Sequence, residues 1–267
     1  MNAHVEPSLS DPILLRSDDR GVVTLTLNRP AQFNSLSLAM LAELQAALDA
    51  VSADASARVV VIAGAGKAFC AGHDLKEMRA NRNHAFIKDL FEQCSRMMVT
   101  ITQLPQPVIA RVHGIATAAG CQLVSMCDLA VASEDARFAT SGINVGLFCA
   151  TPGVGLSRNV SRKRAMEMLL TGDFIDARTA LDFGLVNRVV PAIELDSAVS
   201  KLTAAIVAKT PVAVAAGKRM FYRQLEMGLG DAYALAAETM ACNMMADDAA
   251  EGIDAFIGKR TPNWKGR

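Results

Sequence analysis

Two segments rich in small residues each follow a predicted buried strand. Residues 67–75 come after the apolar run 59–63 and a Gly-Ala-Gly turn, and residues 112–122 come after the predicted strand 107–111. Because Gly and Ala add little bulk, such turns let the backbone approach a ligand closely. Two strand-end turns that each offer a backbone N–H to one oxygen would form an oxyanion hole, which stabilises negative charge on a carbonyl group.

Few side chains near these turns can take part in acid–base or nucleophilic chemistry. His73 lies in the first turn and is the leading candidate, whereas we expect Asp74 to cap the helix that follows. Cys149 could act as a nucleophile only with a base beside it, and residues 147–153 supply none, so we expect it to line the site. His113 ends a predicted strand and is interpreted as structural.

Composition limits the classes of protein to which this chain can belong. Its 267 residues are 51% hydrophobic and 20% charged, with a formal net charge of zero, which predicts a well-buried core and disfavours nucleic acid as the main partner. The six cysteines lack the paired spacing of a zinc site, so no metal is expected. No apolar run reaches the ~18 residues of a membrane span. Residues 1–11 lack the order of charges and apolar residues typical of a secretory signal, so we expect a cytoplasmic location.

Apolar periodicity predicts strands alternating with helices in the first part of the chain. Strands are predicted at 22–27, 59–63, 108–112 and 129–132, and helices at 38–51, 86–104 and 118–127. Ser37 can cap the first of these helices, and the polar stretch 78–84 is predicted to be a loop. This alternation favours an α/β fold with a mainly parallel sheet whose faces are covered by helices.

The pattern changes after about residue 160. Helices are predicted at 165–171, 177–183, 193–210, 212–224 and 233–245, with a single strand-like run at 186–190. No repeat or low-complexity linker separates the two parts. We therefore expect a flexible N-terminus over residues 1–15, an α/β core over 16–200 and a helical region over 201–267 that packs on this core.

Several short motifs in a fixed order resemble the crotonase superfamily, which is the enoyl-CoA hydratase/isomerase family. The resemblance runs from about Val22 to Trp264 and covers nearly the whole chain. Its landmarks are Asn28-Arg29-Pro30, residues 34–36, residues 68–75, residues 107–110 with His113-Gly114, residues 127–130, residues 168–172, residues 180–186 and residues 251–260. The resemblance implies a spiral of ββα turns and C-terminal helices that build a homotrimer or a dimer of trimers.

The same resemblance implies a ligand and assigns roles to residues. The ligand is an acyl-coenzyme A thioester, which is the substrate, so no separate cofactor is expected. The N–H groups of His73 and Ala119 resemble the two that hold the thioester oxygen. The adenine is expected near Ala68 and Ala71, and Arg29 and Lys259 are candidates for the nucleotide phosphates. The predicted coenzyme A-binding set is completed by Asp74, Leu75 and Phe256.

Two positions depart from the hydratase pattern. The family places glutamates where this chain has Gln122 and Gly142, and those carboxylates activate water and deliver a proton. The amide of Gln122 does not titrate and Gly142 has no side chain, so neither is a general base. Loss of one acid–base group costs about 10²- to 10⁴-fold in rate. The sequence therefore predicts a weak or non-standard hydratase.

Three functions remain open on the sequence. The first is an enzyme that stabilises a thioester enolate and uses a non-standard proton donor. The second is a decarboxylase of malonyl-type thioesters, because His73 lies where that branch of the superfamily has a histidine, although Cys149 stands where it has a tyrosine. The third is a non-catalytic protein that only binds acyl-CoA. Methylmalonyl-CoA, crotonyl-CoA and binding assays would distinguish them.

Overall fold

The computed structural model describes residues 12–267, and most of the predicted N-terminal segment, residues 1–11, lies outside the described residues. One sheet contains six strands, and only its first pair is antiparallel. Its strands in spatial order are β1 (Leu14–Asp19), β2 (Val22–Leu27), β3 (Val59–Gly64), β5 (Val108–Val112), β7 (Leu129–Ser133) and β10 (Arg188–Val190). The prediction of a mainly parallel sheet is confirmed, and the fold begins at Leu14 rather than at residue 16.

A second, smaller sheet accompanies the first. Its strands in order are β4 (Ala68–Cys70), β6 (Ile115–Thr117), β8 (Arg137–Ala139) and β9 (Ile175–Asp176). Each of β4, β6 and β8 follows a strand of the large sheet after a short turn, and a helix comes next. This repetition of strand, strand and helix is the predicted spiral of ββα turns, because β4, β6 and β8 stack in parallel beside one another.

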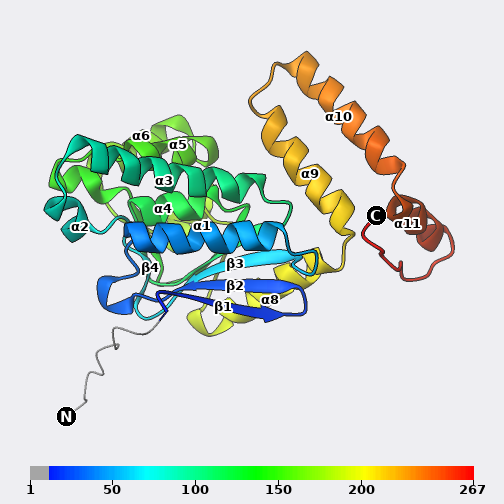
Figure 1. Ribbon diagram of the computed structural model, residues 1–267, viewed down its shortest axis with the longest axis horizontal. Helices are drawn as coiled ribbons and strands as arrows, with labels where there is room; N and C mark the ends of the chain where they lie inside the picture. Colours follow the sequence, from blue (N-terminus) through cyan, green and yellow to red (C-terminus); the bar gives the residue numbers. More distant parts are fainter. Residues whose placement is uncertain (1–11) are drawn as a thin grey trace, which may run out of the picture.

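Helices cover the sheets, as the blue and green ribbons of Figure 1 show. They are α1 (Leu38–Ser52), α2 (Leu75–Ala80), α3 (His84–Gln103), α4 (Ala119–Met126), α5 (Ala150–Asn159), α6 (Arg162–Thr171), α7 (Ala177–Phe183) and α8 (Leu195–Val207), with short 3-10 turns η1 (Pro30–Gln32), η2 (Ser141–Val145) and η3 (Ala192–Glu194). The hydroxyl of Ser37 accepts a hydrogen bond from the Met40 N–H and caps α1, as predicted. The apolar stripe of α1, which includes Leu41, Leu44 and Leu48, is fully buried.

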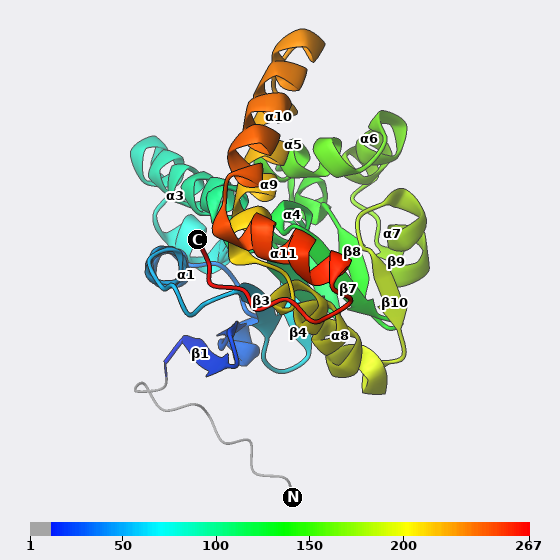
Figure 2. The same cartoon turned by 90° about the vertical axis from the view of Figure 1, so that its right-hand side faces the viewer.

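The last three helices form an arm that extends from the core (Figures 1 and 2). They are α9 (Pro211–Gln224), α10 (Leu229–Met244) and α11 (Asp247–Ile257). One buried lysine ties α9 to the core, because Lys218 Nζ donates to the carbonyl oxygens of Ile101 and Gln106 and lies 2.6 Å from Asp128 Oδ2. Tyr222 donates to the other carboxylate oxygen of Asp128 at 2.9 Å.

Large apolar side chains lie exposed along this arm within a single chain. They are Phe221, Leu225, Leu229, Tyr233, Met240, Met244, Met245, Ile253, Phe256 and Ile257. Such a surface is typical of an interaction site. Trimer formation through this region stays a prediction.

Several details differ from the sequence predictions. The predicted loop 78–84 is wrong at both ends, because α2 continues to Ala80 and α3 begins at His84. Helices α5 and α11 were not predicted, since α5 contains a proline and two glycines and α11 is interrupted by a glycine. The predicted boundary at residue 200 falls inside α8.

Across residues 12–267 no single helix is long and apolar enough to cross a membrane. The helix pair 192–207 and 211–224 reaches that length only with a bend of 104° between its two parts.

Candidate functional site

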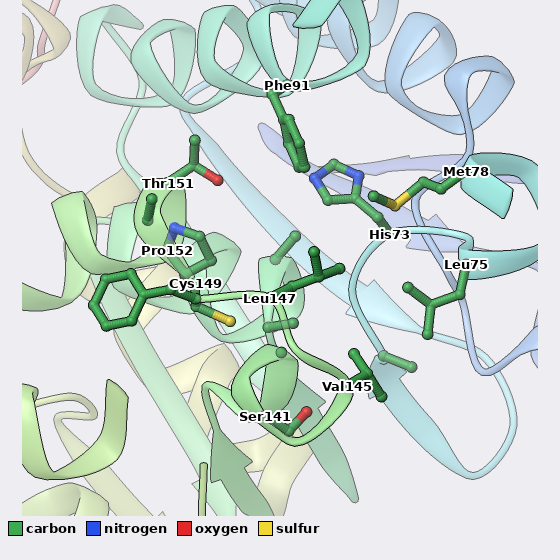
Figure 3. Close-up of a pocket in the computed structure, with 16 residues that line it drawn as sticks. His73, Leu75, Met78, Phe91, Ser141, Val145, Leu147, Cys149, Thr151 and Pro152 are labelled. Carbon is green, nitrogen blue, oxygen red and sulfur yellow. The ribbon is translucent and has the colours of Figure 1, made fainter. Parts of the chain in front are cut away.

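A cavity of about 230 Å³ lies where the first small-residue turn meets the N-terminal ends of α4 and α5. Figure 3 shows its labelled side chains, which converge from α2, α3, η2 and the loop before α5. Its lining residues are Ala71, His73, Leu75, Met78, Phe91, Ala118, Ala119, Ser141, Gly142, Val145, Leu147, Phe148, Cys149, Ala150, Thr151 and Pro152. The structure therefore brings together six of the residues selected from the sequence: Ala71, His73, Leu75, Ala119, Gly142 and Cys149.

The turn before His73 touches the beginning of α4. Gly72 has a φ of +88°, and a Cβ atom added there would lie 3.1 Å from the backbone nitrogen of Ala119. The same atom would lie 2.9 Å from the Cβ of Ala118. Only glycine can adopt this φ and also approach the neighbouring backbone so closely. The lack of a side chain at Gly72 therefore allows the first turn to contact the turn that begins α4.

The N–H groups of His73 and Ala119 have no acceptor among residues 12–267. The parallel bridge between Leu36 and His73 uses the carbonyl of Gly72 and the N–H of Asp74, so it leaves the His73 N–H unused. Ala119 is the first residue of α4, where an N–H has no partner within the helix. Both residues line the cavity.

Ala118, which precedes α4, has an unusual backbone conformation. Its φ of 50° and ψ of −120° lie in a region that residues with a Cβ rarely occupy. Such a conformation costs on the order of 1–3 kcal/mol and persists only where the surrounding structure imposes it. Here its N–H donates to the carbonyl of Ala139 at 3.0 Å, and this bond holds the turn that orients Ala119.

The side chain of His73 is part-buried at the edge of the cavity. Its Nδ1 lies 3.4 Å from the carbonyl oxygen of Leu36, and its ring meets the ring of Phe91 edge to face with centroids 5.2 Å apart. The Nε2 atom is buried without a partner among the described residues. Burial lowers the pKa of His73, although the contact with Leu36 opposes this change, so the imidazole is neutral at pH 7.

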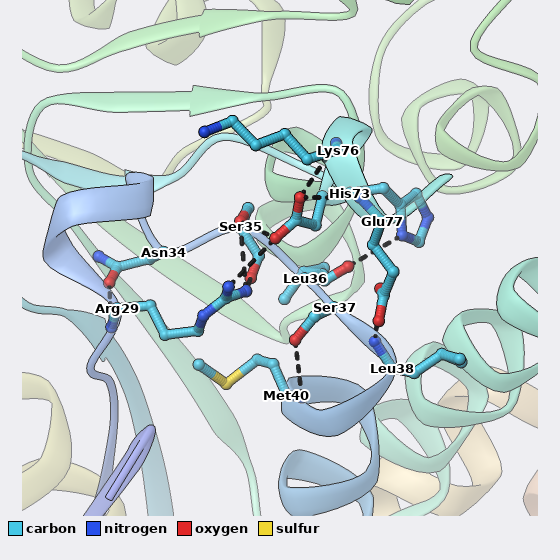
Figure 4. A network of polar contacts seen from close by, with 11 residues as sticks. Arg29, Asn34, Ser35, Leu36, Ser37, Leu38, Met40, His73, Lys76 and Glu77 are labelled. Carbon is cyan, nitrogen blue, oxygen red and sulfur yellow. Dashed lines mark hydrogen bonds and ion pairs between the residues drawn. The ribbon is translucent and has the colours of Figure 1, made fainter. Parts of the chain in front are cut away.

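Asp74 and Arg29 form a part-buried ion pair behind the first turn (Figure 4). Their Nη2 and Oδ2 atoms are 3.1 Å apart, and Arg29 also donates to the carbonyl of Ser35. Asp74 caps α2 by accepting from the N–H groups of Lys76 and Glu77, as predicted. Burial alone would raise the pKa of Asp74, but the hydrogen bonds from Glu77 and Arg29 lower it below its ordinary value.

Asn34 is a structural residue of the site whose role the sequence did not reveal. It is fully buried with a φ of 56°. Its Nδ2 donates to the carbonyls of Ala65 and Ala68, and its Oδ1 accepts from the N–H of Arg29. A polar residue inside the motif 34–36 could have indicated such a link, whereas the sequence did not single out Phe91 as a cavity residue.

Gly142 and Cys149 meet on the opposite wall of the cavity. A Cβ atom added to Gly142 would lie 2.7 Å from the Sγ of Cys149 and 2.6 Å from the carbonyl oxygen of Leu147. The thiol therefore fills the space through which any side chain at position 142 would enter. Burial raises the pKa of Cys149, and a hydrogen bond from the Gly142 N–H partly opposes this change.

Gln122 lies beside the cavity rather than in its lining. The residue is 5% exposed, and its Oε1 is buried without a hydrogen-bond partner in the described part of the chain. It belongs to the first turn of α4, whose N-terminal end faces the cavity. A buried carbonyl oxygen without a donor is a destabilising feature that a ligand or water can satisfy.

The cavity is poor in titratable groups. Among its lining residues only His73 and Cys149 have titratable side chains, and no carboxylate is present. Within residues 12–267 no group of three or more His, Cys, Asp or Glu residues could hold a metal ion. Acid–base chemistry by side chains in this cavity therefore rests on these two residues.

The other predicted coenzyme A-binding residues lie outside the cavity. Ala68 is buried in β4. Phe256 belongs to α11 and is 86% exposed, and Lys259 follows this helix. Figure 1 shows α11 at the opposite end of the molecule from α2, so residues of the arm do not reach the cavity of their own chain.

Comparisons with known proteins identify the family of this chain. Residues 17–267 match the family described as enoyl-CoA hydratase/isomerase. A Xenopus laevis protein named mitochondrial enoyl-CoA hydratase domain-containing protein 3 is 46% identical over 95% of this chain and 86% of its own length. An Escherichia coli 2,3-dehydroadipyl-CoA hydratase is 36% identical over 95% of this chain and 99% of its own.

Solved structures give the same result for the fold. A crystal structure of an enoyl-CoA hydratase from Mycobacterium smegmatis is 61% identical to this chain and superposes with a TM-score of 0.94. The match covers 95% of this chain and 99% of the other. The chain belongs to the enoyl-CoA hydratase/isomerase family, and it has the crotonase fold.

Proposed function

We propose that this protein binds an acyl-CoA thioester and stabilises its enolate between the N–H groups of His73 and Ala119. The observation that carries the proposal is that both groups lack an acceptor among the described residues and line one cavity. Gly72 brings their two turns into contact. A preset N–H donor of this kind contributes about 3 kcal/mol to stabilising a developing oxyanion.

Two helix N-termini add to the positive potential of the cavity. Ala119 begins α4, and Cys149 and Ala150 lie at the beginning of α5, which packs against α4. A helix N-terminus carries a partial positive charge and favours an anion beside it. The cavity contains no carboxylate that would cancel this potential.

The proposal also concerns the reaction that follows enolate formation. Hydration needs groups that activate water and deliver a proton, and the two family glutamate positions hold Gln122 and Gly142 in this chain. We therefore expect slow or non-standard hydration, with coenzyme A as part of the substrate and no separate cofactor.

A proline substitution tests the proposed donor directly. In Ala119→Pro the N–H is removed at the first helical position, where proline is tolerated. Enolisation of bound acetoacetyl-CoA, followed by its ultraviolet absorption, should weaken about 10²-fold. Arg162→Pro, at the first position of α6, is the matched control and should keep the wild-type signal. Absence of acetoacetyl-CoA binding by the wild-type protein would refute the proposed function.

A malonyl-type decarboxylase using His73 is the second candidate, and the absence of a carboxylate from the cavity lining favours it. Loss of CO₂ leaves an enolate without any general base, and the N–H groups of His73 and Ala119 would stabilise that enolate. Release of CO₂ from methylmalonyl-CoA would support this function. Binding of coenzyme A thioesters without turnover of any substrate would leave the non-catalytic binding function.

Two broader properties remain proposals. The relatives from Xenopus laevis and Homo sapiens are named as mitochondrial, and our expectation for this chain is a cytoplasmic location. The exposed apolar residues of α9–α11 support assembly into a homotrimer or a dimer of trimers. In such an assembly Lys259 and Phe256 would serve the cavity of a neighbouring subunit.

A further inference from the structure

We propose that the thiol of Cys149 delivers the proton to the α-carbon of the thioester enolate. The inference rests on the proposed function, because it requires an enolate held by His73 and Ala119. Figure 3 shows the sulfur of Cys149 directed into the space bounded by the labelled residues. Cys149 lines the same cavity as both backbone donors.

The sulfur of Cys149 lies where a side chain on residue 142 would begin. Because a Cβ at Gly142 would lie 2.7 Å from Sγ, the thiol stands where a side chain from residue 142 would enter the cavity. A thiol therefore stands at the point where a longer side chain on residue 142 would begin, and it can donate a proton. With Gly142 and Cys149 side by side, the acid on this wall is a thiol in place of a carboxyl group.

The surroundings keep the thiol protonated and stabilise the thiolate that forms. Burial raises the pKa of Cys149, so the group is an acid rather than a nucleophile at neutral pH. After transfer, the Gly142 N–H favours the thiolate, because it opposes the rise in the pKa of Cys149, and Cys149 is the N-cap residue of α5. Both features favour negative charge on the sulfur.

His73 would accept a proton and is not the proton donor. With Nδ1–H donating to the carbonyl of Leu36, the neutral ring presents an unprotonated Nε2, which can accept a proton but has none to give. The titratable groups of the cavity lining thus divide into one acceptor and one donor. Ser141 and Thr151 add hydroxyls that are far weaker acids than a thiol.

The proposed step balances without a further reactant. The enolate electron pair forms the new C–H bond, the S–H bond breaks, and its electron pair stays on sulfur as the thiolate. Solvent then returns a proton to sulfur. In reverse, the thiolate removes the same α-hydrogen, so the protein exchanges one α-hydrogen of a saturated acyl-CoA with solvent.

Deuterium exchange into butyryl-CoA in D₂O, followed by NMR, tests the step in the full-length protein. The wild-type protein should exchange one of the two α-hydrogens, at a rate that rises with pH as the thiolate population grows. Cys149→Ala and Cys149→Ser should each lower this rate by about 10²-fold or more. Binding of butyryl-CoA by calorimetry should change less than threefold, and Cys242→Ala, at an exposed cysteine of α10, is the matched control.

The outcomes separate this inference from the function on which it rests. If the wild-type protein does not bind butyryl-CoA or acetoacetyl-CoA, the proposed function fails. If it binds and enolises acetoacetyl-CoA but exchanges no α-hydrogen of butyryl-CoA, or if both Cys149 variants exchange at the wild-type rate, the assignment of the donor is wrong while the function stands. Two variants are used so that a folding defect in one of them, detected by circular dichroism, leaves the other informative.

Discussion

The two walls of the cavity are built on different principles. The wall formed by residues 71–75 and the beginning of α4 presents backbone groups, and it depends on the positive φ values of Gly72 and Ala118. The wall formed by residues 141–152 presents side chains, and its close contact joins Gly142 to the sulfur of Cys149. Under the proposed function, the backbone groups of the first wall would bind the anion, and the side chains of the cavity would select the reaction. The comparison teaches that these two properties can be tested by separate substitutions.

The largest expected effect comes from breaking the backbone wall at Gly72. In Gly72→Ala the new Cβ meets Ala118 and the nitrogen of Ala119 in a backbone with φ of +88°. Strain and overpacking together should lower the free energy of unfolding by about 3 kcal/mol, measured by urea denaturation. Gly146→Ala is the matched control: Gly146 has a φ of +79° but no atom within 4 Å of the new Cβ, so the loss there should be about 1 kcal/mol. Equal losses would show that the contact between the turns is unimportant.

A smaller effect should come from the side-chain wall. Gly142→Glu forces its side chain against the Cys149 sulfur and should cost about 2 kcal/mol of stability. Cys149→Gly removes the sulfur but leaves the carbonyl oxygen of Leu147, 2.6 Å from the new Cβ, so the double variant should recover only part of the loss in thermal unfolding. Additive effects in this double-mutant cycle would contradict the contact. Crotonyl-CoA hydration by the double variant then measures whether a carboxylate on this wall changes the reaction.

The pH dependence of stability provides a test of the part-buried His73. Its pKa is lowered in the folded protein, so the unfolded chain binds more protons below pH ~6.5 and stability falls as the pH drops through this window. The loss is at most about 1.4 kcal/mol per pH unit and ends below the folded-state pKa. The melting temperature of His73→Gln should therefore fall less between pH 7.5 and pH 5.5 than that of the wild type. His84→Gln, at an exposed histidine, is the control, and the same pH response in both variants would exclude this role.

The smallest expected effect concerns strain at Ala118. Ala118→Gly removes the strain of a positive φ but increases the entropy of the unfolded chain, so stability should rise by about 1 kcal/mol. Urea denaturation measures this gain. A loss of stability would mean that the methyl group contributes packing that outweighs the strain.

The long elements of the fold were predictable because each carries a local signal. Strand β5 lies at the predicted residues and α1 ends one residue beyond its predicted limit, since apolar periodicity and the Ser37 cap mark them. The short strands β4, β6 and β8 carry no such signal, because their pairing depends on how successive turns of the chain stack.

The site was predictable only in part for a similar reason. The sequence identified both small-residue turns, and the structure places His73 and Ala119 on one cavity. It did not reveal the contact of Gly142 with Cys149 or the edge-to-face packing of Phe91 on His73. These contacts join residues from separate elements, and single-residue propensities contain no information about such distances.

The buried lysine of the arm has a consequence for how the chain unfolds. Asp128 Oδ2 accepts from Lys218 and also from the N–H of Val108, the first residue of a central strand. If α9 detached alone, Asp128 would lose its ion pair with Lys218 and its hydrogen bond from Tyr222, and each hydrogen bond to such a charged group contributes about 1.5–3 kcal/mol. The helical extension and the sheets should therefore melt together in one cooperative transition, and a chain truncated before α9 should lose stability throughout rather than only at its end.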